Sequence, residues 1–75
     1  MSYDEFVEYY YTLTKEAEKQ FGTESQYLSD LIDEYNEIAE PNVTTGTIFA
    51  TAMYDSMKKQ NDMIFLNLAK KFFEN

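Results

Sequence analysis

The fold is decided by residues 47–73, which read TIFATAMYDSMKKQNDMIFLNLAKKFF and contain neither glycine nor proline. Apolar side chains recur in this stretch at spacings of three, four or seven, which is the periodicity of one face of an α-helix. They are Phe49, Met53, Met57, Ile64 and Leu68. The pattern predicts one long helix over about residues 46–73, about 40 Å in length. A kink near Asn61, inside a polar patch, is the alternative.

A first, shorter helix is predicted over about residues 3–21. Ser2 and Glu5 have the spacing of a capping box at its start, and Gly22 ends it. The side chains expected to be buried recur at helical spacing, and they are Phe6, Tyr10, Leu13, Ala17 and Phe21.

A second helix is predicted over about residues 24–40. Thr23 and Gln26 have capping-box spacing, and Pro41 ends the helix because the residue before a proline is pushed out of helical dihedrals. Its expected buried side chains are Leu28, Leu31, Ile32, Tyr35 and Ala39, and Phe72 is expected inside at the end of the third helix. No alternation typical of strands is present. The sequence therefore predicts a single all-α domain over residues 1–75, with two short helices packed on one long helix and no sheet.

Size and composition limit the chemistry. The chain has 75 residues, 14 acidic residues, 6 lysines, no Arg and no His, and its net charge is −8. A compact chain of this size buries only roughly 63% of its unfolded surface, and the absence of Cys excludes a disulfide. No motif indicates catalysis, a cofactor or a metal site. The sequence predicts a non-enzymatic protein that gains stability by dense packing or by self-association.

Residues 63–73 are apolar almost all round the predicted helix, whereas a surface helix of a monomer has a polar side. We therefore expect this half of the third helix to pack against a second copy, giving a homodimer. The residues expected at that contact are Met63, Phe65, Leu66, Ala69 and Phe73.

Negative charge is confined to the first part of the chain. Residues 1–40 contain 11 acids and 2 lysines, a net charge of −9, whereas residues 41–75 contain 3 acids and 4 lysines, a net charge of +1. Like charges three or four residues apart cost about 0.2–0.5 kcal/mol per pair in a helix. The acidic face expected to bind a partner comprises Asp4, Glu8, Tyr11 and Glu18 on the first helix and Asp30, Asp33, Glu34, Glu37 and Glu40 on the second.

Two interpretations of this face remain open. It can be a solvated surface that keeps a small protein soluble, or an anionic surface shaped to occupy a groove built for nucleic acid. Direct binding to nucleic acid is contradicted by the charge.

The chain is very short, acidic and free of Cys, and its seven Tyr and six Phe exceed what three small helices can hide. In this composition and charge layout it resembles bacteriophage-encoded inhibitors that mimic DNA, including those that plug the host polymerase sliding clamp and those that block nucleases. The resemblance covers the whole chain but rests on no motif. It implies a basic DNA-binding protein as partner and action in the host cytoplasm.

Three further expectations follow. The alternative function is a helical adaptor that acts through the apolar third helix, with the acids serving only solubility.

The stretch Asp55-Ser56-Met57 resembles the Asp-Ser-Leu attachment motif of acyl carrier proteins, which implies a carrier role for Ser56. No signal sequence is visible and the apolar run at residues 63–66 is too short to span a bilayer, so we expect a cytoplasmic protein without a membrane partner.

Overall fold

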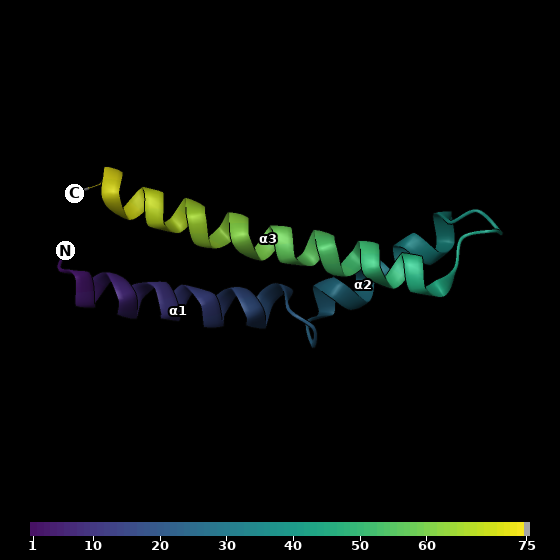
Figure 1. Ribbon diagram of the computed structural model, residues 1–75, viewed down its shortest axis with the longest axis horizontal. Helices are drawn as coiled ribbons and strands as arrows, with labels where there is room; N and C mark the ends of the chain where they lie inside the picture. Colours follow the sequence, from purple (N-terminus) through teal and green to yellow (C-terminus); the bar gives the residue numbers. More distant parts are fainter. Residues whose placement is uncertain (75) are drawn as a thin grey trace.

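The computed structural model describes residues 1–74 and contains three helices, α1 (Tyr3–Phe21), α2 (Gln26–Ile38) and α3 (Thr45–Phe73). α1 runs antiparallel to the C-terminal half of α3, and α2 crosses the N-terminal half (Figure 1). The molecule is elongated, with extents of 52 × 21 × 15 Å. Residues 1–74 contain no strand, and the predicted arrangement of two shorter helices on one long helix is confirmed.

α3 forms one uninterrupted helix. The Thr44 hydroxyl caps its start by accepting a hydrogen bond from the main-chain N–H of Thr47 at 3.1 Å. Lys70 and Lys71 lie in its last turn, where positive charge complements the helix dipole. The helix passes Asn61 unbroken, so the alternative with a kink there is wrong.

α1 begins and ends where the sequence predicts. The Ser2 hydroxyl accepts a hydrogen bond from the N–H of Glu5 at 3.2 Å, and the N–H of Gly22 donates to the carbonyl oxygen of Glu18 at 2.7 Å. Gly22 is required for space, because a Cβ atom there would lie 2.3 Å from that carbonyl oxygen.

α2 is shorter than predicted at both ends. Its N-cap is Ser25 and not Thr23, because the buried Ser25 hydroxyl can accept from the N–H of Leu28 while Thr23 lies exposed in the turn. The helix ends at Ile38, since Ala39 already has extended dihedrals. The expected position of Glu40 on this helix is therefore wrong.

Few apolar side chains are buried among residues 1–74, and they are Leu13, Ala17, Leu28, Ile48 and Ala52. The buried positions of α3 are Ile48, Ala52 and Ser56, each four residues apart. These positions form the seam along which α3 contacts the other helices, and the small side chains of Ala52 and Ser56 let the helices approach closely. The expected burial of Tyr10 and Phe72 is wrong, because both side chains lie exposed. Phe49 and Met57, which belong to the apolar face predicted for the third helix, are exposed too.

Candidate interaction surfaces

A polar junction holds the three helices together near the middle of the molecule. The buried hydroxyl of Ser56 and the side-chain amide of Gln60, both on α3, donate hydrogen bonds to the carbonyl oxygen of Phe21, the last residue of α1. Next to it, the Ser25 hydroxyl donates to the carbonyl oxygen of Gly22 at 2.7 Å. Ser56 is only 2% exposed and lies inside α3, so the carrier role suggested by its motif is wrong.

A second polar contact joins α2 to α3. The phenol of Tyr35 donates a short hydrogen bond to the carboxylate of Asp55. This hydrogen bond, partial burial and the negative charges of Asp55 and Glu34 together raise the pKa of Tyr35 from 10.0 to about 12. Neither contact gathers reactive groups around an enclosed space, and both serve to position helices.

The acidic side chains of α2 point away from α3. Four carboxylates lie exposed on the side of α2 opposite its buried Leu28, and they are Asp30, Asp33, Glu34 and Glu37. At 1.5 Å per residue the successive rises along the helix axis are about 4.5, 1.5 and 4.5 Å, and their average of about 3.5 Å is close to the spacing of about 3.4 Å between phosphates of one DNA strand. Glu40 is also exposed, but it lies beyond the end of the helix. No lysine lies between Gly22 and Pro41.

The expected acidic residues of α1 are exposed too, and they are Asp4, Glu8 and Glu18, together with Tyr11. Lys15 and Lys19 share their side of the helix, so this surface is less strongly negative than that of α2.

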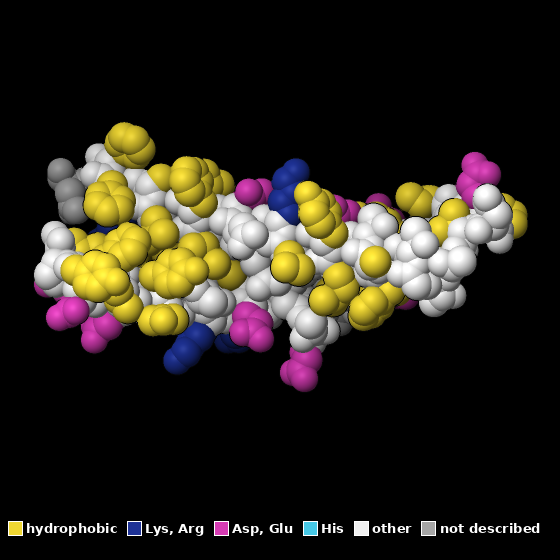
Figure 2. All heavy atoms as spheres, in the orientation of Figure 1, with side chains coloured by type: hydrophobic (Ala, Val, Ile, Leu, Met, Phe, Trp, Pro, Cys, Tyr) yellow, Lys and Arg dark blue, Asp and Glu magenta, His cyan; other side chains and the backbone are white. Residues whose placement is uncertain are grey.

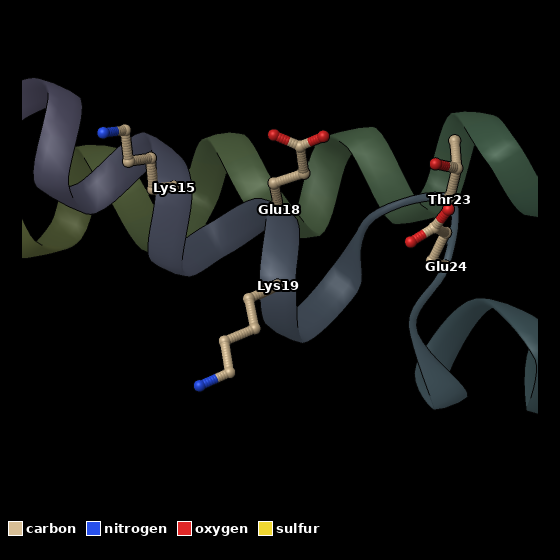
Figure 3. A pocket seen from close by; sticks show the side chains of 5 residues that line it. All are labelled: Lys15, Glu18, Lys19, Thr23 and Glu24. Atoms are coloured by element: carbon tan, nitrogen blue, oxygen red, sulfur yellow. The ribbon is translucent and has the colours of Figure 1, made fainter.

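A hollow of about 510 Å³ lies at the turn after α1. Its lining residues are Lys15, Glu18, Lys19, Thr23 and Glu24, and Figure 3 shows the two amines pointing away from each other. Residues 1–74 contain no group of three acidic side chains placed to hold a metal ion.

Apolar side chains form a further exposed surface. Figure 2 shows hydrophobic side chains gathered on one face, over the end of the molecule where the two chain ends lie, with acidic side chains along its edge. Of the predicted self-association residues, Phe65, Leu66 and Phe73 are exposed, by 69%, 62% and 89%. Met63 and Ala69 are half-buried.

The sequence placed Tyr3 among the aromatic residues left outside the core, and it is exposed. Tyr10 and Phe72 were expected in the core, yet they are exposed at the same end of the molecule as Tyr3. Their spacing carried a usable signal, because Tyr3, Phe6 and Tyr10 repeat at three and four residues, as do Phe65, Leu68 and Phe72.

Within residues 1–74, no helix combines the length and the apolar composition needed to cross a membrane. A family model described as Phage 80a gp11 protein matches residues 1–75, and the chain belongs to this family. No curated protein and no solved structure matches it. The bacteriophage origin implied by composition thus agrees with a match over the whole chain.

Proposed function

We propose that this phage protein is a non-enzymatic inhibitor that presents the acidic surface of α1 and α2 to the basic DNA-binding channel or cleft of a host replication or nuclease protein. A sliding clamp is the first candidate, because its ring encloses DNA. The inhibitor would act in the host cytoplasm as part of host takeover, by occupying the place of DNA without contacting nucleic acid.

The observation that carries the proposal is the row of four exposed carboxylates on α2, whose average axial spacing is close to that of phosphates on one DNA strand. Asp30 with Glu34 and Asp33 with Glu37 are like charges four residues apart, which destabilise an isolated helix. A helix selected only for solubility gains by alternating acids with lysines, as α1 does with Lys15 and Lys19. The unmixed row on α2 favours recognition by a basic partner.

Electrostatic recognition has a measurable signature. Each basic group that contacts a carboxylate loses part of its attraction when salt screens the charges, and the Debye length falls from about 10 Å at 0.1 M to about 3 Å at 1 M. Immobilised full-length protein should capture a basic DNA-binding protein from host lysate at low salt and release it at high salt. Capture that is unchanged by salt would contradict electrostatic binding.

A charge-reversal variant tests the surface itself. The triple variant Asp33→Lys, Glu34→Lys and Glu37→Lys should lose capture of the partner and inhibition of its DNA binding. Its matched control reverses Glu16, Glu24 and Glu74, which are exposed elsewhere on the molecule. Each reversal adds two charges to the net −8, so both variants carry −2. Equal loss in the two variants would indicate a dependence on net charge alone.

A second candidate function is supported by the exposure of Phe65, Leu66 and Phe73. In this alternative the protein is a helical adaptor that binds another protein through α3, and the acids serve solubility. Replacing Phe65 and Leu68 by polar residues separates the two functions. If the protein is an adaptor, the wild type captures its partner independently of salt and this variant loses the partner. If it is the inhibitor, the variant keeps salt-sensitive capture through α2.

A further inference from the structure

At the end of the molecule where the two chain ends lie, α1 and the C-terminal half of α3 form a single layer of two helices, since α2 packs on the other half of α3 (Figure 1). The radius of gyration is 15.8 Å, against about 11 Å for a compact chain of 75 residues. Stable domains bury their apolar surfaces between at least two packed layers. One layer is therefore missing from the isolated chain.

The surface area gives the size of what is missing. The chain exposes 5900 Å², whereas a compact protein of 8.9 kDa exposes about 4,800 Å². The excess of about 1,100 Å² compares with about 800 Å² buried per partner in an interface of standard size. The excess is thus sufficient for one protein interface.

Exposed and half-buried apolar side chains of α1 and α3 form a surface that we term the aromatic face (Figure 2). It comprises Tyr3, Phe6 and Tyr10 on α1 and Phe65, Leu68 and Phe72 on α3. The two rows meet where the rings of Phe6 and Phe72 lie with centroids 6.2 Å apart. Because α1 and α3 are antiparallel, both rows lie over the same end of the molecule (Figure 1).

Each row combines a half-buried side chain with more exposed ones. Phe6 and Leu68 are half-buried and form the floor of the aromatic face, while Tyr3, Phe65 and Phe72 stand 78%, 69% and 61% exposed. In each row the spacing is three and then four residues, which is the spacing by which helices interdigitate in bundles and coiled coils. None of its six residues is charged.

We propose that the aromatic face binds a second copy of this chain, so that α1 and α3 of one protomer and the same two helices of its partner form a four-helix bundle. A two-fold axis places the same surface on both protomers, which is the commonest form of protein self-association. A second copy supplies the missing layer and an apolar area equal to the one it covers. The contact differs from one made by α3 alone, since half of it comes from α1.

This arrangement does not depend on the proposed function and responds to salt in the opposite direction. Two protomers of net charge −8 repel each other, and screening by salt weakens that repulsion while the apolar contact remains. Self-association should therefore strengthen as salt is raised, whereas binding of a basic partner to α2 should weaken. The two proposals can fail separately.

Light scattering on the full chain measures the molar mass directly. We expect twice 8.9 kDa for the wild type at micromolar to millimolar concentration. The double variant Phe65→Lys and Phe72→Lys should have half that mass and remain helical. A control, Ile38→Lys, changes an apolar side chain that is 73% exposed on α2, far from the aromatic face, and should leave the doubled mass unchanged.

A cross-linking measurement keeps the test decisive if the double variant fails to fold. The chain has no Cys, so a single introduced thiol reports only on contact between copies. Oxidation of Phe65→Cys, Leu68→Cys or Phe72→Cys should give a dimer band for at least one position near the two-fold axis, and Ile38→Cys should give none.

A wild type of single mass throughout that concentration range overturns the proposal. Binding of that monomer to lipid vesicles, or to a different protein at the aromatic face, would identify another occupant and equally overturn it.

Discussion

The hydroxyl of Ser56, at the middle of α3, donates a hydrogen bond to the carbonyl oxygen of Phe21, the last residue of α1. Carbonyl groups in the last turn of a helix lack partners within their own helix. Ser56 and Gln60 satisfy this one from across the seam. The contact links residues 35 positions apart and fixes where α1 ends along α3.

Removal of this contact should cost stability in two steps. Ser56→Ala should lower the free energy of unfolding by about 1 kcal/mol, because the amide of Gln60 still donates to the carbonyl oxygen of Phe21. Ser56→Ala with Gln60→Ala should lower it by about 2–3 kcal/mol, since that oxygen then has no donor. Urea denaturation followed by circular dichroism measures both. Equal losses in the single and double variants would show that Gln60 contributes nothing.

Two glycine replacements should act in opposite directions. Gly22→Ala places a Cβ atom against the main-chain oxygen of Glu18, so the backbone must shift and stability should fall by about 1–3 kcal/mol. Gly46→Ala, on α3, brings Cβ only to 3.9 Å from the nearest atom and should stabilise by about 0.5–1 kcal/mol through helix propensity. Thermal melts of both variants check the signs. A stabilised Gly22→Ala would refute the steric role of Gly22.

Substitution of the hydroxyl residues Thr23 and Ser25 should have different effects on stability, because only Ser25 caps α2. Ser25→Ala removes the acceptor for the N–H of Leu28 and the donor to the carbonyl oxygen of Gly22, and should cost about 1–2 kcal/mol. Thr23→Ala changes an exposed turn residue and should alter stability by less than about 0.5 kcal/mol. Denaturant midpoints measure the stability of both variants. A larger loss of stability in Thr23→Ala than in Ser25→Ala would show that Thr23 is the N-cap, as expected from the sequence.

Alkaline pH should loosen α2 from α3. The neutral phenol of Tyr35 is the donor to Asp55, and its pKa is raised to about 12 in the folded protein against 10.0 without this environment. The stabilisation is fully present below pH 10 and is lost as the pH rises through about 12. Tyr35→Phe should remove this part of the pH dependence. Stability measured from pH 9 to pH 12 in both proteins checks it, and parallel profiles would contradict the assignment.

The helices could be predicted from local spacing, because caps and apolar periodicity act within a few residues. Thr23 and Ser25 both suit an N-cap, and only the buried position of Ser25 against the end of α1 decides between them. Burial of Ser56 depends on a carbonyl group distant in sequence.

The aromatic face was the part that sequence alone could not place. Periodicity predicted an apolar side for each helix, but a single layer leaves part of that side exposed. Phe72 was therefore expected in the core although it is 61% exposed. The exposed acids of α2 were predicted with their correct orientation, because charge avoids burial in any arrangement of these helices.

The start of α1 and the end of α3 lie at the same end of the molecule, beside the aromatic face (Figure 1). An affinity tag or fluorescent protein joined to either end would lie next to Phe6 and Phe72 and obstruct the aromatic face. The connection between α2 and α3, residues 39–44, lies at the opposite end and is exposed along most of its length. A reporter inserted there leaves the aromatic face clear, so the choice of labelling position decides which surface of the protein an assay can observe.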